Sequence, residues 1–246
     1  MLKSSAAALL ALGLFSSPAL AAKIPAYVTA AVADPARPKD DVKQDASRDP
    51  ADTIAFAGVK PGMKVGELFP GGGYFSYMLI DVVGPKGAVW GMENTGWKGA
   101  VDADDKVVAA IGKPNLKVDG EPFGQFKLPG KVDLFWITQN YHDLHIAKYG
   151  KVDMAAFNKA VFDALRPGGT YFILDHDATP GTTDEQISKL HRIPKAEVIK
   201  EVTAAGFKFQ SEGKFLERPG DDFSKTVFDP AVRGKTNQYA LKFVRP

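Results

Sequence analysis

Two patterns of apolar and polar residues alternate along this chain, one typical of strands and one typical of helices. Short apolar runs bounded by glycine, proline or charged residues predict strands, and longer segments with apolar residues three or four positions apart predict helices. Seven strands are expected, over residues 64–68, 88–92, 116–118, 132–138, 170–174, 207–211 and 238–244. Helices are expected from Pro50 to a point before Pro61, with Asp49 as N-cap, and over residues 74–83, 101–111, 157–165 and 194–205.

The order of these elements predicts an α/β fold. Strands and helices alternate and most strands are apolar throughout, which is typical of a mostly parallel sheet with helices on both faces. The last two strands have no helix between them, so the final strand is expected to return antiparallel. Residues 49–246 form the predicted domain, and residues 22–48, rich in proline and charge, are expected to form an arm with one short helix.

The first residues predict export. Lys3 precedes an apolar stretch over residues 6–15, and Ala19-Leu20-Ala21 offers small residues for cleavage. The stretch is shorter than the roughly 20 residues that span a bilayer. We therefore expect a signal peptide over residues 1–21 and a soluble periplasmic protein with no membrane span after cleavage.

Composition narrows the function classes. Of the 246 residues, 45% are hydrophobic and 24% are charged, as in ordinary globular domains. The formal net charge is +2 and basic residues are interleaved with acidic ones, so no nucleic-acid partner is expected. The chain has no cysteine, which excludes disulfides, thiolate catalysis and cysteine-ligated zinc.

The turn after the first predicted strand carries the clearest candidate chemistry. Glu67 lies within the strand, and Gly71, Gly72 and Gly73 follow shortly after it, so a ligand could lie against backbone N–H groups. The glycines nearly match the G-x-G-x-x-G/A pattern of dinucleotide-binding turns, and Glu93 lies 20 residues after Gly73, where that pattern has an acidic residue. A pyrophosphate at this turn would face Glu67, however, so a cofactor with an ammonium group and no phosphate suits the site better.

Four segments resemble class I S-adenosylmethionine-dependent methyltransferases. Residues 65–74 resemble that family's first motif, residues 89–93 its second strand with a ribose-binding acid, residues 131–136 its fourth strand, and residues 165–175 the run through its fifth strand. The arrangement also resembles a group of predicted exported methyltransferases. The resemblance covers about Asp49 to Val244 and implies a Rossmann-like class I methyltransferase fold that binds S-adenosylmethionine.

The resemblance also implies cofactor-binding residues. These are Glu67, Gly71, Gly72, Gly73, Tyr74, Glu93, Asp119, Asn140 and Tyr141. Glu67 would lie near the methionine end of the cofactor, Glu93 would accept the ribose hydroxyls, and Asp119 would lie near the adenine. Asn140 and Tyr141 would flank the methyl donor. Phe69 departs from the pattern, because the family usually has glycine there, and its ring could narrow the pocket or stack on the ligand.

Histidines supply the candidate base. Methyl transfer depends mainly on alignment of the reactants, and a base is needed only when the nucleophile starts protonated. We expect His142 to be that base, oriented by Asp143 or a nearby acid; alternatively it closes a hydrogen bond within its loop. His176 and His191 are expected near the same face. With Asp143, Asp175 and Asp177, the four histidines could form an oxygen- and imidazole-rich metal site, but their spacing lacks a tight metal motif, so no metal is expected.

The sequence thus predicts methyl transfer to a small-molecule acceptor that it does not identify. A non-catalytic periplasmic binding or interaction module on the same fold stays open, because of Phe69 and because export leads to a compartment without an obvious cofactor supply. An NAD-dependent oxidoreductase ranks last because of Glu67. The long segment 217–237 is expected to be a lid or a surface decoration, and the oligomeric state is not disclosed.

Overall fold

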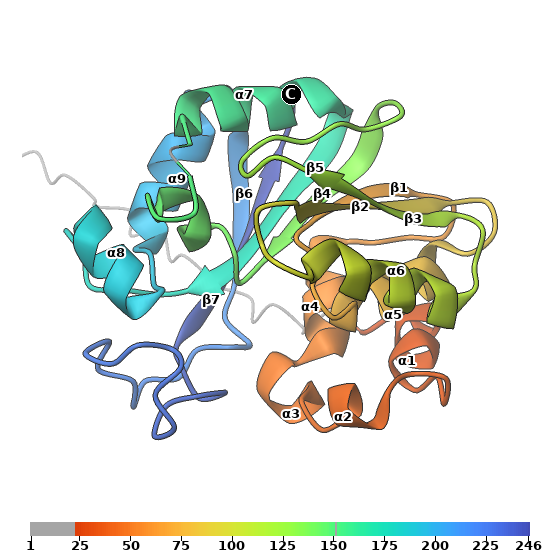
Figure 1. Ribbon diagram of the computed structural model, residues 1–246, viewed down its shortest axis with the longest axis horizontal. Coiled ribbons are helices and arrows are strands. Elements are labelled where there is room, and N and C mark those ends of the chain that lie inside the picture. Colours follow the sequence, from red (N-terminus) through yellow and green to blue (C-terminus); the bar gives the residue numbers. More distant parts are fainter. Residues whose placement is uncertain (1–22, 151) are drawn as a thin grey trace, which may run out of the picture.

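A single seven-stranded sheet forms the centre of the computed structural model, which describes residues 23–150 and 152–246 (Figure 1). The strand order is β3-β2-β1-β4-β5-β7-β6, and only β7 runs antiparallel to its neighbours, β5 and β6. The predicted sheet, with its antiparallel last strand, is confirmed. The strands are β1 Lys64–Leu68, β2 Ala88–Asn94, β3 Leu116–Glu121, β4 Val132–Thr138, β5 Leu165–His176, β6 Lys208–Gly213 and β7 Gln238–Val244.

Nine α-helices and one short 3₁₀ helix are described in residues 23–150 and 152–246. They are α1 Ala26–Val32, α2 Lys39–Val42, α3 Asp45–Arg48, α4 Pro50–Ala57, α5 Tyr74–Val83, α6 Ala100–Ile111, η1 His142–His145, α7 Met154–Ala164, α8 Asp184–Leu190 and α9 Lys195–Ala204. None of these helices has the length and apolarity to cross a bilayer. The expected signal peptide, residues 1–21, lies outside the described residues.

Helices cover both faces of the sheet because neighbouring residues of a strand point to opposite sides. On β4, Leu134 and Trp136 belong to the core under α1, α4 and α5. Phe135 and Ile137 belong to the core under α7 and α9. All four side chains are fully buried, which explains why the central strands read as unbroken apolar runs.

The segment before α4 differs from the expected arm with one helix. It forms three helices, α1 to α3, and α1 buries Val28 and Ala31 against the core that contains α5. Arg37 donates two hydrogen bonds to the Asp45 carboxylate and one to the Val32 carbonyl. The Tyr74 hydroxyl, at the start of α5, also donates to Asp45, at 2.7 Å. These contacts hold the segment against the glycine turn.

One local prediction is confirmed in position only, and one helix was not predicted. Asp49 stands at the N-cap of α4 but has φ of 43°, and its side chain makes no capping bond; Thr53 instead donates to the Asp49 carbonyl. Helix α8 was not predicted, although Thr183 and Gln186 form a capping box at its start. That pattern was visible in the sequence, but α8 has only seven residues and buries only Ile187.

Removing the Arg37 guanidinium should loosen the N-terminal helices. The Arg37 side chain is 1% exposed, and Arg37→Met would leave the Asp45 carboxylate half-buried with one partner fewer. We expect a loss of about 2 kcal/mol in the free energy of unfolding, measured by urea denaturation. Lys43→Met removes a pair with Asp40 that is exposed on both sides, and should change stability by less than about 0.5 kcal/mol. Equal effects of the two substitutions would contradict the role given to Arg37.

Candidate functional site

The glycine turn connects β1 to α5 through backbone that most residues avoid. Gly71 and Gly73 have φ of 56° and 75°, and a Cβ at Gly73 would lie 2.3 Å from the Val107 side chain of α6. At Gly71 and Gly72 a Cβ would meet nothing within 4 Å, so bare backbone borders open space there. Glycine is thus required at position 73 by close packing against α6, whereas at positions 71 and 72 it leaves room for a ligand.

Buried carboxyl groups surround this turn. Glu67, in β1, accepts a hydrogen bond of 2.7 Å from the Ser76 hydroxyl of α5. Glu93, in β2, accepts from the backbone N–H groups of Gly71 and Asn94, at 3.1 Å and 2.7 Å. In this structure, Glu93 therefore fastens the glycine turn to the neighbouring strand.

Burial changes the acidity of these carboxyl groups. It raises the pKa of Glu67 to about 7, although the Ser76 hydrogen bond works in the opposite direction. Burial and the neighbouring Glu93 raise the pKa of Asp104, in α6, to about 8. The pKa of Glu93 is also raised by burial, against the bonds from Asn94 and Gly71. Near neutral pH, this part of the site is thus poised to bind or release protons.

Two cavities meet beside the glycine turn. The first has a volume of about 320 Å³ and is bordered by Glu67, the turn, Asn140 and residues of the N-terminal helices. The second, of about 440 Å³, is bordered by His176, Phe228 and Arg233. Gln44, Arg48 and Gln139 border both.

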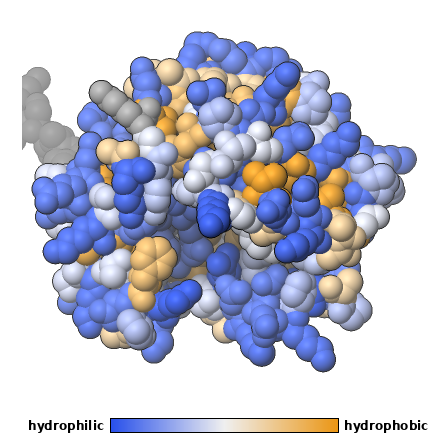
Figure 2. Space-filling view, viewed as in Figure 1, coloured by the Kyte–Doolittle hydropathy of each residue, from blue (hydrophilic) through white to orange (hydrophobic). Residues whose placement is uncertain are grey.

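The molecular face in Figure 2 is mostly hydrophilic, with smaller apolar patches. A further cavity of about 650 Å³, between η1, α8 and α9, shares no bordering residue with these two.

Phe69 belongs to a cluster of four aromatic rings. It stacks on Phe123 with ring centroids 5.7 Å apart and an interplanar angle of 3°, and it contacts Trp97 at 4.9 Å. Tyr149 completes the cluster by packing on Trp97 and Phe123. Phe69 has φ of 52°, the left-handed conformation that glycine adopts without strain. The packing of the ring holds a bulky residue in this conformation.

The chain after β4 is positioned by Asp175, a fully buried residue of β5. One oxygen of its carboxylate accepts the His142 backbone N–H at 2.8 Å. The other lies 2.7 Å from His142 Nδ1 and accepts the backbone N–H of His176 at 2.7 Å. Asp175, rather than Asp143, is therefore the acid that orients the His142 ring, and Nε2 is the ring atom left for another partner.

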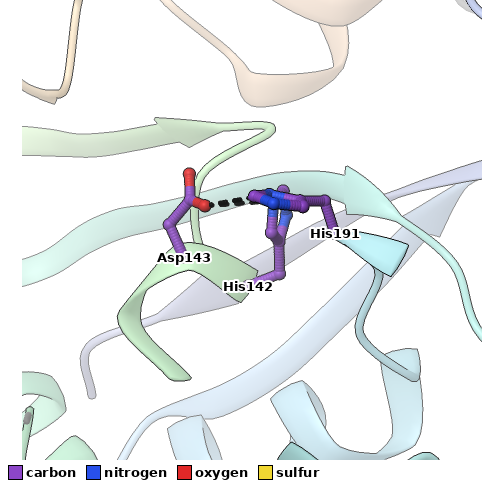
Figure 3. Close-up of side chains that lie close together, drawn as sticks. All are labelled: His142, Asp143 and His191. Atoms are coloured by element: carbon purple, nitrogen blue, oxygen red, sulfur yellow. Dashed lines mark ion pairs between the residues drawn. The ribbon is translucent and has the colours of Figure 1, made fainter. Parts of the chain in front are cut away.

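The Asp143 carboxylate faces two neighbouring imidazoles (Figure 3). Its Oδ1 is 3.4 Å from His142 Nε2 and 3.3 Å from His191 Nδ1, and its Oδ2 accepts a 2.8 Å hydrogen bond from Asn140. Burial lowers the pKa of His142, but Asp175 and Asp143 outweigh it and leave this pKa above its ordinary value. Burial holds the pKa of His176 well below its ordinary value.

The structure separates two of the predicted residues from the turn. Tyr141 is fully buried, and its hydroxyl donates to Glu201 of α9 and accepts from Asn158 of α7. Asp119 is exposed on the edge strand β3, opposite Met92 of β2. Neither borders the two cavities, whereas Tyr74 and Asn140 border the first.

The N-terminal helices supply residues that the sequence did not single out. Asp41, Gln44 and Arg48 border the first cavity. The Arg48 guanidinium lies 4.5 Å from the centre of the Tyr74 ring. No local motif marks these residues, because their place depends on how the helices pack against α5.

Solved methyltransferases share this fold at low sequence identity. A SAM-dependent methyltransferase from Aquifex aeolicus matches with a TM-score of 0.58 at 18% identity, over 85% of this chain and 100% of that one. Fibrillarin from Aeropyrum pernix, with natively bound S-adenosyl-L-methionine, gives 0.53 at 17%, over 82% and 76%. An arsenic(III) S-adenosylmethionine methyltransferase from Chlamydomonas reinhardtii gives 0.57 at 17%, over 89% and 73%.

These similarities show the Rossmann-like methyltransferase fold predicted from the sequence. No protein-family model matches the chain, and no curated protein matches its sequence. What the site binds and does must therefore be argued from its own residues.

Glu67 should make the stability of the protein depend on pH. Its pKa in the folded protein, about 7, exceeds the ordinary value of 4.5, so the folded state binds this proton more tightly than the unfolded state does. The resulting stability is present below the ordinary pKa and is lost as the pH rises through 7. The loss amounts to about 3 kcal/mol.

We expect Glu67→Gln to remove this component from urea-unfolding curves recorded between about pH 5 and pH 8. Glu185→Gln, at an exposed position in α8, serves as the control and should keep the pH dependence of the unaltered protein. Parallel pH profiles for the Glu67→Gln variant and the unaltered protein would contradict the raised pKa.

Proposed function

We propose that this protein is an S-adenosylmethionine-dependent methyltransferase acting on a small-molecule acceptor in the periplasm. The observation that carries the proposal is the glycine turn at the carboxyl end of β1, open to a cavity that Glu67 borders. Ligands of open α/β sheets bind at this edge, beyond the ends of the strands. The likeness in fold to methyltransferases supports the same reading.

The residues around the first cavity suit the proposed cofactor. Gly71 and Gly72 offer bare backbone, and the Glu67 carboxylate would pair with the ammonium of the methionine part. Glu93, which binds the turn but does not border the cavity, would accept the ribose hydroxyls in place of backbone N–H groups. Tyr74 and Asn140 would border the ligand. We still place Asp119 near the adenine, because it lies in β3 at the edge of the sheet. Tyr141 is assigned to the core instead, because Glu201 and Asn158 bind its hydroxyl.

We assign the acceptor to the second cavity, which borders the first. Arg48, Arg233 and His176 border it, so it suits a small polar molecule with an anionic group. In the transfer, the nucleophile of the acceptor forms a bond to the methyl carbon while the carbon–sulfur bond breaks, leaving the demethylated cofactor. Where the nucleophile arrives protonated, the neutral form of His142 is the proposed base, acting through Nε2 with Asp143 beside it; neither side chain borders the second cavity.

A non-catalytic binding module on the same fold is the second candidate. The observation in its favour is that Glu93 is 1% exposed, with both oxygens engaged by backbone, and that the Phe69 ring belongs to the adjoining aromatic cluster. A protein of this kind would bind a ligand in the cavities without methyl transfer. An NAD-dependent oxidoreductase is third, since a buried carboxyl group beside the glycine turn does not suit a pyrophosphate.

Calorimetric titration tests the proposal. S-adenosylmethionine and its demethylated product should both bind, and Glu67→Gln should weaken binding about tenfold or more, which corresponds to about 1.4 kcal/mol. Glu185→Gln should bind like the unaltered protein. Because the pKa of Glu67 is about 7, an ammonium beside it should expel the proton from the fraction that is protonated. Near pH 7 we expect release of about half a proton, seen as a dependence of the binding enthalpy on the buffer.

The outcomes separate the three candidates. Binding of neither ligand at about millimolar concentration would overturn the proposal, and binding of NAD instead would favour the oxidoreductase. Binding of S-adenosylmethionine without turnover over a broad set of small anionic acceptors would favour the module. Undiminished affinity in a folded Glu67→Gln variant would contradict the assignment of Glu67 to the binding site.

A further inference from the structure

We propose that His142, Asp143 and His191 bind one divalent transition-metal ion. One ligand atom of each residue lies within 4.8 Å of those of the other two, and all three side chains are buried. Two of the residues come from η1 and the third follows α8, so the group is assembled by tertiary structure (Figure 3). The proposal departs from the expectation of no metal, which rested on spacing along the sequence.

The distances fit coordination better than hydrogen bonding. Hydrogen bonds between an imidazolium and a carboxylate are about 2.7–2.9 Å long. Asp143 Oδ1 lies farther than that from both imidazole nitrogens, at 3.3 Å and 3.4 Å. Ligands held tetrahedrally about 2.1 Å from an ion are spaced about 3.4 Å apart. Both spacings from Asp143 thus match those of ligands around a small cation, and the ligand atoms of the two imidazoles lie within 4.8 Å of one another.

Two further hydrogen bonds orient the ligands. Asp175 Oδ1 lies 2.7 Å from His142 Nδ1, so a proton held there leaves the lone pair of Nε2 directed at the cluster. Asn140 donates to Asp143 Oδ2, which leaves Oδ1 for the ion. Carboxylates and amides behind metal ligands commonly have this role.

The backbone at His191 is fixed in an uncommon conformation. Its φ is 55°, a left-handed value that strains a residue with a Cβ. The next residue, Arg192, is fully buried and donates two hydrogen bonds to Asp221 and others to the Lys225 and Asp177 carbonyls. These bonds hold His191 beside Asp143.

The ligand set indicates which ions fit. Two imidazoles and one carboxylate suit Zn²⁺ or Co²⁺, whereas Mg²⁺ and Ca²⁺ prefer oxygen ligands throughout. Three protein ligands leave a position for water or for an oxygen or nitrogen donor of a small molecule. Phe228, which is 56% exposed and borders the second cavity, packs on His191 with ring centroids 4.8 Å apart. It covers the approach to the metal from that side.

Coordination changes the role of His142. The ion would occupy Nε2, the nitrogen through which His142 is proposed to act as a base, so the residue cannot serve in both ways at once. The metal site does not depend on the proposed methyl transfer, because metal binding is measured without cofactor or acceptor.

Cobalt titration of the chelator-treated full chain tests the inference. We expect one equivalent of Co²⁺ to bind with visible absorption bands typical of tetrahedral or five-coordinate cobalt, and Zn²⁺ to displace it. The dissociation constant for Zn²⁺ should be about 1 μM or lower. Absence of the bands, together with Zn²⁺ binding weaker than about 100 μM, would overturn the proposal.

Three matched substitutions locate the site. Asp143→Asn and His191→Gln each remove one ligand and should weaken Zn²⁺ binding about a hundredfold or more. His145→Gln is the control, because its imidazole also lies near carboxylates, 3.3 Å from Glu201 and 3.7 Å from Asp184, but outside the cluster. It should keep the affinity of the unaltered protein. Circular dichroism checks that each variant folds. If one ligand variant does not fold, the affinity of the other variant and the cobalt spectrum of the unaltered protein still test the assignment. Unchanged affinity in a folded Asp143→Asn or His191→Gln variant would overturn the assignment.

Discussion

The buried carboxylate of Asp175 is the interaction on which the arrangement beyond the strand ends depends. It comes from β5, yet it accepts the backbone N–H of His142 and bonds its ring, joining the chain after β4 to the end of β5. A buried carboxylate without partners would be strongly destabilising, so the chain must bring those donors to it. That requirement fixes η1, and with it Asn140 on the cofactor side and Asp143 on the side of the histidines.

The two candidate sites therefore share one edge of the sheet and one connecting residue. Asn140 borders the cavity at the glycine turn and donates to Asp143. On one side lie the buried carboxyl groups of Glu67 and Glu93, and on the other two imidazoles lie beside the Asp143 carboxylate. A ligand that changes the position of Asn140 acts on both sides, since the same side chain belongs to both. The first cavity and the His142 cluster are thus joined by one hydrogen bond, although His142, Asp143 and His191 do not border that cavity.

The strands were predictable because burial on both faces leaves apolar runs that a sequence shows directly, and the missing helix before β7 gave its direction. The glycine turn was predictable because its conformation restricts residue type. Helices α1 to α3 were not, since Arg37 and Arg48 gain their roles through partners in other elements. His191 was expected near the face of His142, but its contact with Asp143 depends on how α8 packs and could not be predicted. Tyr141, placed near the methyl donor by motif, turns toward α7 and α9 because Asn158 and Glu201 bind its hydroxyl.

The position of β7 has a consequence for biosynthesis. It follows every other strand along the chain but lies inside the sheet, between β5 and β6. Until residues 238–244 have left the ribosome, β5 keeps an unpaired edge and β6 has no partner. Pairing across such long stretches of chain is slow to nucleate. In a nascent polypeptide of this topology, the part of the sheet beyond β5 therefore forms only when translation is nearly complete.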